Sequence, residues 1–465
     1  MGGVMYRRSA KSDPIYRLDR PANESGYKPD MNRISGAPLR GMHPFSLACR
    51  KWRQAVSAVM ETIKGAHSQT QSGRLAIIGA VFQPDRIIPM RMLRLFFCLL
   101  FFPIFAAAQQ APVPPTLDAK AWLLVEYASG QTLAAQNPDE RLEPASLTKL
   151  MTAYLVFAAI RQGSLKLDQS IMVSEKAWRS QGSRMFLRVN TQVPVEDLIK
   201  GMIVQSGNDA SVALAEAVAG SEENFAQKMN EEAKRLGMTG SSFRNAAGMP
   251  DPQHYTTASD LARLTMALLR DFPEEYAKYY SLKEFHYNKI TQPNRNRLLW
   301  LDPSVDGVKT GHTDAAGYCL ISSAKRDSRR LIAIVLGTAS EKVRERESLK
   351  LLNFGFQAYE VVKLQAKGEP LATPRLWKGA QNSVKAGFAD EFVVAVPRGL
   401  AQKLTSEFVP QKPLVAPITQ GQTVGVLKVS LDGKPYGEYA VAAQESVEPA
   451  GFFGRLIDAI LLWFQ

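Results

Sequence analysis

Two kinds of hydrophobic pattern follow one another between residues 117 and 360, and their order is what most constrains the fold. Strand-like runs stand at both ends of this region, at 120–137 and 305–338, and helical repeats fill the middle. Such an order is typical of α+β domains, in which helices pack on one sheet. We therefore predict an α+β domain whose sheet is closed by its terminal strands. The helical repeats cover 144–162, 195–204, 209–219, 221–236 and 258–270.

The composition of the sequence changes after about residue 363. Pro and Gly recur regularly there, and the β-rich runs include EFVVAV and QTVGVLKVSLDGKPYGEYAVAA, in which Asp432-Gly433 marks a hairpin turn. Short runs of this kind, bounded by turn residues, predict strands. We expect residues 365–445 to form a small all-β domain.

Residues 451–465 predict an amphipathic helix. Eight large apolar side chains cover most of its surface, and the few small or polar residues fall on the opposite side. At ~1.5 Å per residue the helix would be roughly 22 Å long, which is short for the ~30 Å apolar core of a bilayer. A helix lying in the membrane plane fits this pattern better. A terminal helix packed on the β domain is the alternative.

A cleavable export signal is predicted at residues 90–108. Two arginines open it, an apolar run over 95–105 follows, and three alanines supply the small residues of a cleavage site. This is the layout of a secretory signal peptide, which is removed from the mature protein. Residues 1–89 lack sustained periodicity, so we expect them to be disordered or to precede the true start. A cytoplasmic tail on a signal anchor is the alternative.

The positive charge of the chain is concentrated in this front part. Residues 1–108 hold 16 Lys and Arg against 6 Asp and Glu, so 10 of the 13 net positive charges lie there. The net positive charge, which is the main argument for a nucleic-acid partner, therefore lies mostly outside the predicted domains.

Only Cys319 lies beyond residue 108, so the exported chain can form no intrachain disulfide. We expect this cysteine in the core.

A lysine stands inside the apolar helical run EPASLTKLMTAYLVFAAI, residues 143–160. Ser146 and Lys149 are three residues apart, so on a helix they share one face. Apolar surroundings disfavour a charged lysine, and so does the positive end of the helix dipole. A neutral lysine amine is a base, which a serine hydroxyl needs to become a nucleophile. Alone, the pattern S-x-x-K is weak because it arises often by chance.

Two later segments strengthen this interpretation. VQSGNDAS carries Ser206 and Asn208 on a tight loop between helical repeats, and VDGVKTGHT carries a K-T-G triplet on a strand-like segment. The order S-x-x-K, S-x-N, K-T-G is the signature of penicillin-interacting serine acyltransferases. Ser206 can relay a proton, and Asn208 can hold a substrate amide. Lys309 and Thr310 suit a substrate carboxylate, and Gly311 lets the strand approach a ligand closely.

The chain resembles the low-molecular-mass penicillin-binding proteins that are serine-type D-alanyl-D-alanine carboxypeptidases. The resemblance covers nearly all of 117–465 and rests on PASLTKLMT, QSGNDA, NRNRLLW and VDGVKTGHTDAAGYCL, together with the β-rich second domain and the terminal amphipathic helix. It implies a transpeptidase-like α+β catalytic domain over 117–360, followed by a β-sandwich and the helix.

The resemblance also implies roles for individual residues. Ser146 would be the acyl-ester nucleophile and Lys149 its general base, with Ser206 and Asn208 completing the catalytic centre. The residues implied to bind substrate are Lys309, Thr310, Gly311, His312, Arg295 and Arg344, the last of these through the terminal carboxylate. Apart from Arg344, we expect the run KVRERES at 342–348 to be the solvated start of a helix.

By the same resemblance the chain would remove the terminal D-Ala from peptidoglycan stem pentapeptides and be acylated by β-lactam antibiotics. It would use no cofactor and no metal. It would act in the periplasm, attached to the outer face of the cytoplasmic membrane through its C-terminal helix. The histidines beyond residue 108, which are His254, His286 and His312, lack the usual spacing of metal ligands.

Three other functions share part of the pattern. A class A β-lactamase has the same three motifs and a Glu that activates water. Glu284 and Asn288 have that form, but EFHYNKI alternates like a strand, and Gly207 stands where those enzymes have Asp. A D,D-endopeptidase acting on cross-links would keep the fold. A non-catalytic β-lactam sensor would not need the intact catalytic residues present here.

Overall fold

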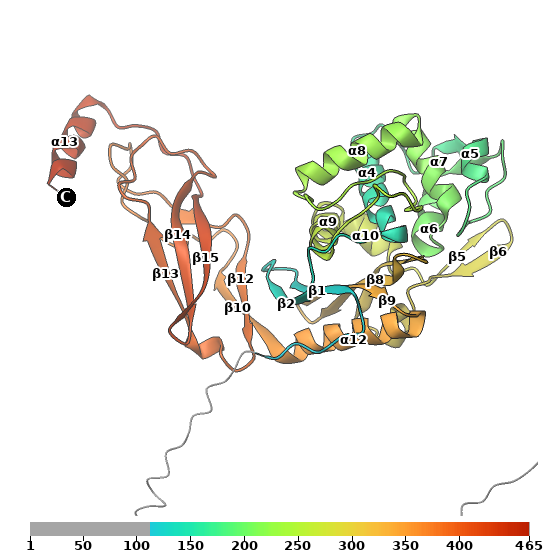
Figure 1. Ribbon diagram of the computed structural model, residues 1–465. Coiled ribbons are helices and arrows are strands. Elements are labelled where there is room, and N and C mark those ends of the chain that lie inside the picture. The colour runs from blue at the N-terminus through green and yellow to red at the C-terminus, as the bar shows by residue number, and fades with distance from the viewer. Residues whose placement is uncertain (1–111, 465) are drawn as a thin grey trace, which may run out of the picture. The chain divides into compact units, whose positions relative to one another are not determined.

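The computed structural model describes residues 112–464, so the predictions for 1–89 and 90–108 lie outside the described residues. A five-stranded antiparallel sheet has the order β2-β1-β9-β8-β7 (Figure 1). β1 pairs with β9, so segments from the two ends of the α+β region join in one sheet, as the order of patterns predicts. The strands are β1 (Ala121–Glu126), β2 (Thr132–Gln136), β7 (Val305–Thr313), β8 (Gly317–Arg326) and β9 (Arg329–Thr338).

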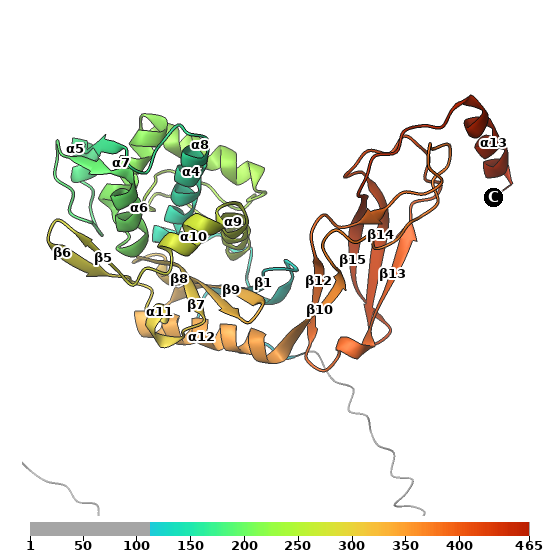
Figure 2. The ribbon, with the colours of Figure 1, turned by 180° about the vertical axis from the view of Figure 1, so that it is seen from behind.

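Both faces of this sheet are covered, which explains why all six residues of β1 are buried. Successive side chains of a strand point to opposite faces. Leu123 and Val125 accordingly join the larger core on the side of the helical layer, whereas Trp122 and Leu124 join the core beneath α12 (Glu341–Ala358). Figures 1 and 2 show α12 along one face of the sheet and the other large helices on the opposite face.

The helical layer follows the predicted repeats closely. The largest difference is at the first repeat, which begins with the 3₁₀ turn η1 (Ala145–Thr148) before α4 (Lys149–Arg161). Ser221, Thr257 and Ser340 each accept a backbone N–H at the start of a helix, as capping residues do. The other helices of the α+β region are α5 (Glu175–Trp178), α6 (Val195–Val204), α7 (Asn208–Ala219), α8 (Glu222–Arg235), α9 (Ala258–Asp271), α10 (Pro273–Tyr279) and α11 (Leu298–Leu301).

Two short hairpins lie outside the main sheet: β3 (Ser170–Met172) with β4 (Gln192–Pro194), and β5 (Glu284–Tyr287) with β6 (Ile290–Pro293). The second hairpin contains the predicted strand EFHYNKI. Its turn residues Asn288 and Lys289 have φ of 48° and 65°. Glu284 is therefore an exposed residue of a hairpin strand.

The run 342–348 begins a helix, as expected, but the expectation that it is solvated was wrong for two residues besides Arg344. Glu347 is 2% exposed and Ser348 is fully buried, in addition to Arg344. The reason is the helical period, because residues spaced three and four apart on α12 face the sheet whatever their polarity. The buried positions of α12 are Arg344, Glu347, Ser348, Leu351, Leu352, Gly355 and Phe356.

The C-terminal part is the small all-β domain that the sequence predicts. β10 (Tyr359–Gln365) pairs with β12 (Phe392–Pro397), and a four-stranded sheet has the order β11-β15-β14-β13. The hairpin turn at Asp432 and Gly433 has positive φ at both residues, the geometry for which Asp-Gly is favoured. The other strands are β11 (Ala386–Gly387), β13 (Leu404–Pro410), β14 (Thr423–Leu431) and β15 (Lys434–Ala443).

The last described element is α13 (Phe452–Trp463), none of whose residues is buried. Its Asp458 carboxylate accepts the backbone N–H of Lys378 at 2.5 Å, which attaches the helix to the β domain. Over residues 112–464, no helix is both long enough and apolar enough to cross a bilayer.

One buried carboxylate joins α7 to the segment that precedes α6. Asp209 is 1% exposed, and its Oδ1 accepts the N–H groups of Met185 (3.0 Å) and Ala210 (2.9 Å). Its Oδ2 accepts the N–H of Leu187 at 3.1 Å. The Asn208 N–H donates to the Ser183 carbonyl at 2.7 Å beside these bonds. Asp209 therefore fixes the start of α7 against residues 183–187.

We predict that Asp209→Ala lowers the free energy of unfolding by about 3 kcal/mol, because it leaves buried N–H groups without an acceptor. Urea unfolding followed by circular dichroism measures this change. Asp168→Ala is the matched control, since Asp168 is exposed, and it should change stability by less than about 0.5 kcal/mol. Equal effects of the two substitutions would contradict the assignment.

Candidate active site

Ser146 lies in η1, packed directly against strand β7. An added Cβ at Gly311 would lie 3.1 Å from the Pro144 carbonyl oxygen and 3.3 Å from Ala145 Cβ. Gly311 thus lets η1 approach the strand, in addition to the approach of a ligand expected from the sequence. Ala145 has φ of 46°, a conformation that is uncommon for residues other than Gly. The backbone immediately before Ser146 is therefore held by its surroundings.

Lys149 is 2% exposed, and its Nζ has three hydrogen-bond partners. These are Ser146 Oγ at 2.9 Å, Asn208 Oδ1 at 2.7 Å and the Ala247 carbonyl at 2.6 Å. The amide and carbonyl oxygens can only accept hydrogen bonds. A neutral amine would give its two N–H groups to these oxygens and turn its lone pair toward the Ser146 hydroxyl.

Burial lowers the pKa of Lys149 to about 7, with the Arg295 charge acting in the same direction and Asp209 opposing it. The desolvation of an ammonium group disfavours its charged form. A large fraction of Lys149 is therefore neutral near pH 7, in contact with the hydroxyl whose proton it could accept.

Asn208 is the first residue of α7, and both the oxygen and the nitrogen of its side-chain amide form hydrogen bonds. Its Oδ1 accepts from Lys149, and its Nδ2 donates to the Gln181 carbonyl at 2.6 Å and to Met249 Sδ at 3.3 Å. Asn208 therefore orients the lysine in this structure. To hold a substrate amide, the role expected from the sequence, it would have to exchange one of these partners.

Lys309 is 3% exposed on β7, and its Nζ donates to the Thr310 carbonyl at 3.1 Å. Burial lowers the pKa of Lys309 well below the ordinary value, and the charges of Lys149, Arg295 and Arg344 add to this. A carboxylate bound nearby would offset this concentration of positive charge.

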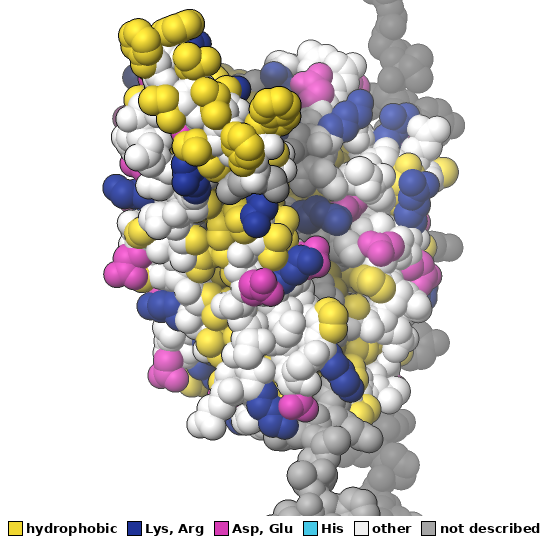
Figure 3. All heavy atoms as spheres, turned by 90° about the vertical axis from the view of Figure 1, so that its left-hand side faces the viewer, with side chains coloured by type: hydrophobic (Ala, Val, Ile, Leu, Met, Phe, Trp, Pro, Cys, Tyr) yellow, Lys and Arg dark blue, Asp and Glu magenta, His cyan; other side chains and the backbone are white. Residues whose placement is uncertain are grey.

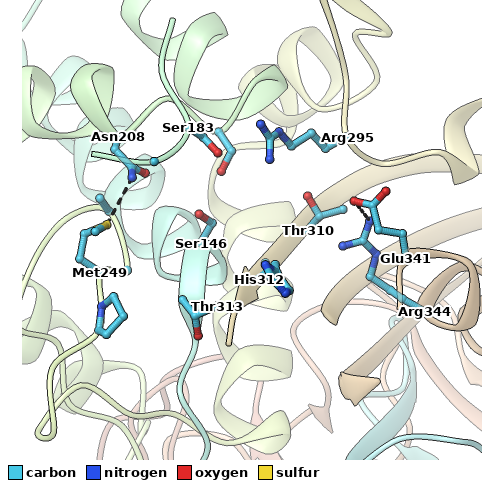
Figure 4. Close-up of a pocket in the computed structure, with 16 residues that line it drawn as sticks. Ser146, Ser183, Asn208, Met249, Arg295, Thr310, His312, Thr313, Glu341 and Arg344 are labelled. Carbon is cyan, nitrogen blue, oxygen red and sulfur yellow. Dashed lines mark hydrogen bonds and ion pairs between the residues drawn. The ribbon is translucent and has the colours of Figure 1, made fainter. Parts of the chain in front are cut away.

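Ser146 and Asn208 line a cavity of ≈ 370 Å³. Figure 4 shows Ser146 facing the cavity, with Arg295, Thr310 and Arg344 on one side of it and Asn208 and Met249 on the other. Lys149 and Lys309 lie beneath the surface and do not line it. The predicted site residues that line the cavity are Ser146, Ser206, Asn208, Arg295, Thr310, Gly311, His312 and Arg344.

Ser206 lies in the tight loop before α7, with φ of 65°. Its Oγ is buried and has no hydrogen-bond partner among the described residues. An unpaired hydroxyl at the wall of the cavity can donate or accept a proton without first breaking another bond.

Sequence reasoning missed a loop that supplies the third partner of Lys149. Asn245 Oδ1 accepts the N–H groups of Ala247, Gly248 and Met249 at 3.2, 2.7 and 2.9 Å. Gly248 has φ of +81°, and a Cβ there would lie 1.8 Å from the Ala145 carbonyl oxygen. Only the Gly in NAAGMP hinted at this turn. The loop presents the Ala247 carbonyl to Lys149.

His254 contacts both this loop and η1. Its Nε2 lies 2.9 Å from Thr148 Oγ1, and its Nδ1 lies 3.3 Å from Asn245 Nδ2. Because the Asn245 amide nitrogen donates, Nδ1 is the acceptor and Nε2 carries the hydrogen. Burial lowers the pKa of His254 to about 4, so the ring is neutral at pH 7.

The structure also shows which groups stand apart from this site. Among residues 112–464, no group of His, Cys, Asp and Glu is arranged to hold a metal ion. Cys319 is buried in the core, as expected. Glu284 and Asn288 do not line the cavity, so Glu284 is not placed to activate water as the Glu of a class A β-lactamase does. Ser183 and Glu341 do line it, and no motif pointed to them.

A serine hydroxyl in contact with a buried lysine of lowered pKa, beside a second lysine on a strand, defines the class of serine acyl-transfer enzymes. Comparison with known families gives the same result. The profile of the peptidase S11 family, D-alanyl-D-alanine carboxypeptidase, matches residues 107–340. The profile of the penicillin-binding protein 5 C-terminal domain matches residues 359–449.

Individual relatives agree with these profiles. The D-alanyl-D-alanine carboxypeptidase DacC of Escherichia coli is 44% identical over 377 residues, covering 79% of this chain and 94% of that protein. DacA of Haemophilus influenzae is 41% identical over 384 residues, 81% of this chain and 98% of its own. The crystal structure of penicillin-binding protein 5 from Haemophilus influenzae matches with a TM-score of 0.69 and 41% identity, over 72% of this chain and 99% of that one.

The chain belongs to the D-alanyl-D-alanine carboxypeptidase family, peptidase S11. It is a serine-type peptidase of the low-molecular-mass penicillin-binding protein kind. The family, the fold class and the enzyme class predicted from the sequence are confirmed.

We predict that Asn245→Ala slows acylation of Ser146 by about 10²-fold, because it releases the loop that holds the Ala247 carbonyl on Lys149. Stopped-flow measurement of penicillin acylation gives the rate constant. Asn382→Ala, at an exposed position of the β domain, should leave the rate unchanged. A normal acylation rate in a folded Asn245→Ala variant would contradict the role of this loop.

Proposed function

We propose that Ser146 attacks the carbonyl carbon of the penultimate D-Ala of a peptidoglycan stem pentapeptide, and that terminal D-Ala leaves. Lys149 takes the hydroxyl proton, and this proton then passes through the Ser206 hydroxyl to the nitrogen of the leaving D-Ala, so that Lys149 is neutral again. Water then hydrolyses the ester between Ser146 and the peptide. The contact of Ser146 with a buried lysine of lowered pKa is the observation that supports this mechanism most.

The developing oxyanion needs hydrogen-bond donors near Ser146. The backbone N–H of Ser146 and one from the part of β7 after Lys309 are the donors in this proposal, and removing such a donor generally costs ~10²–10³ in rate. β-Lactams would acylate Ser146 in the same way and leave an ester that hydrolyses slowly.

The substrate carboxylate is bound by the positive side of the cavity. Arg344 is 2% exposed and lines the cavity, with Glu341 at 3.5 Å as its acidic neighbour. Burial lowers the pKa of the Arg344 guanidinium, so an anion beside it is favoured. Thr310 and Arg295 line the same side. This arrangement suits a peptide with a free carboxylate next to the bond that is cut.

We further propose that the chain is exported, that residues 90–108 form the signal peptide, and that 117–360 and 365–445 are separate domains. The exported chain acts in the periplasm, held on the outer face of the cytoplasmic membrane by residues 451–465. The exposed apolar side chains of α13 support this attachment.

The reaction is tested by D-alanine release from a peptide ending in D-Ala-D-Ala. The chain should release D-alanine, and Ser146→Ala should abolish release, while Ser281→Ala at an exposed position should not. Cleavage of a cross-linked peptide without D-alanine release would favour an endopeptidase. Rapid turnover of penicillin would favour a β-lactamase.

Carboxylate recognition is tested by comparing a D-Ala-D-Ala peptide acid with its C-terminal amide. We predict that Arg344→Ala lowers kcat/KM for the acid by about 10- to 100-fold, because it removes a charge-assisted bond. The amide, which lacks the carboxylate, should be affected little. Lys342→Ala, exposed on the same helix, is the control. Equal losses on the two peptides would refute a carboxylate contact.

Attachment to the membrane is tested by deleting residues 451–465. The shortened chain should move from the membrane fraction to the soluble periplasmic fraction and keep its carboxypeptidase rate. An unchanged membrane fraction would remove α13 as the anchor.

A further inference from the structure

A second cavity, of ≈ 750 Å³, lies in the β domain beside α13. Its walls are the segments 374–377 and 410–414, and Leu462 of α13 lines it as well. The two segments are joined by backbone hydrogen bonds, since the Trp377 N–H donates to the Leu414 carbonyl at 2.9 Å and the Ala416 N–H to the Trp377 carbonyl at 2.9 Å. The walls are therefore fixed without a ligand.

The residues that line this cavity are partly cationic and partly apolar. The Arg375 guanidinium stacks on the Trp377 ring at 3.7 Å, and Trp377 itself is 5% exposed. A stacked guanidinium keeps its N–H edge free, and that edge matches two oxygens of a phosphate. Lys412 brings a second cation, and no Asp or Glu among residues 112–464 lines the cavity. The cavity is thus complementary to an anion with an attached apolar group.

Ion pairs elsewhere in the β domain do not neutralise these two cations. The lysines that pair with carboxylates in this domain are others, namely Lys363, Lys367, Lys385, Lys403 and Lys428. Arg375 and Lys412 are both exposed and therefore reachable from solvent.

The position of the cavity indicates what kind of anion reaches it. α13 exposes large apolar side chains, from Leu461 at 44% to Trp463 at 88%. Figure 3 shows apolar side chains gathered over α13, with Lys and Arg side chains bordering them. A helix whose apolar face enters a membrane lies at the depth of the lipid headgroups. Leu462 joins this helix to the cavity, so the cavity would meet headgroups at the same depth.

We propose that the cavity formed by 374–377, 410–414 and Leu462 binds the headgroup of an anionic phospholipid. Arg375 and Lys412 bind its phosphate, and Trp377, Leu414 and Leu462 contact the start of its acyl chains. This inference rests on the proposed attachment through α13. It adds a lipid preference that α13 cannot supply, because Arg455 and Asp458 are its only charged residues.

The test uses the protein recovered from the exported fraction of cells. Its binding is measured by sedimentation with vesicles of phosphatidylcholine alone and with vesicles of phosphatidylcholine and phosphatidylglycerol in equal parts. The variant Arg375→Gln/Lys412→Gln is compared with Lys403→Gln/Lys434→Gln. The second variant loses the same charge at the far end of β14 and β15, next to the turn at Asp432.

The unaltered chain should bind the vesicles that contain phosphatidylglycerol about 10- to 30-fold more tightly than those of phosphatidylcholine alone, as two surface cations permit. Arg375→Gln/Lys412→Gln should lose this preference and keep its binding to phosphatidylcholine, and the charge-matched control should keep both. If both variants keep the preference for anionic vesicles, or if both lose it equally, a specific headgroup site is overturned.

A second measurement separates this site from the anchor. Titration with monomeric short-chain phosphatidylglycerol, followed by calorimetry, needs no vesicle. Binding that disappears in Arg375→Gln/Lys412→Gln supports the site even if α13 fails to hold vesicles, whereas absence of binding overturns it. Displacement by equal concentrations of inorganic phosphate would assign the cavity to free phosphate and would also overturn the proposal.

Discussion

The burial of one lysine is the constraint on which the rest of the site depends. Lys149 begins α4, surrounded by the apolar side chains that make the helix part of the core, and its Nζ contacts three oxygen atoms. Removal from water makes the charged form costly, and this lowers the pKa of Lys149 to about 7. The same burial that stabilises the helical layer therefore produces a base at neutral pH.

Separate parts of the chain must meet for this lysine to function. The Ser146 hydroxyl comes from η1, the Asn208 amide from the start of α7, and the Ala247 carbonyl from the loop before α9. Each part is held by a specific feature: Gly311 admits η1 beside β7, Asp209 fixes the start of α7, and Asn245 shapes the loop. Tertiary packing, rather than any single motif, therefore sets the distances at the nucleophile.

The sequence predicted the parts that carry a side-chain signature. The S-x-x-K, S-x-N and K-T-G motifs predicted residues that the structure brings to one cavity or directly beneath it, and the order of strands and helices predicted the sheet. The Ala247 carbonyl was not predictable, because any residue supplies a carbonyl and only the fold brings this one to Lys149. The burial of Glu347 and Ser348 was missed because it depends on the sheet beneath α12, which the charged run KVRERES does not reveal.

The most direct test of this account is the pH dependence of Ser146 acylation by a penicillin. The rate constant should rise with pH, bend near pH 7 as Lys149 loses its proton, and level above that pH. Below the bend it should fall by about tenfold for each pH unit, because only the neutral amine accepts the hydroxyl proton. A rate that is flat from about pH 5 to 9, or that rises only near the ordinary lysine pKa of about 10.4, would contradict a buried neutral lysine as the base.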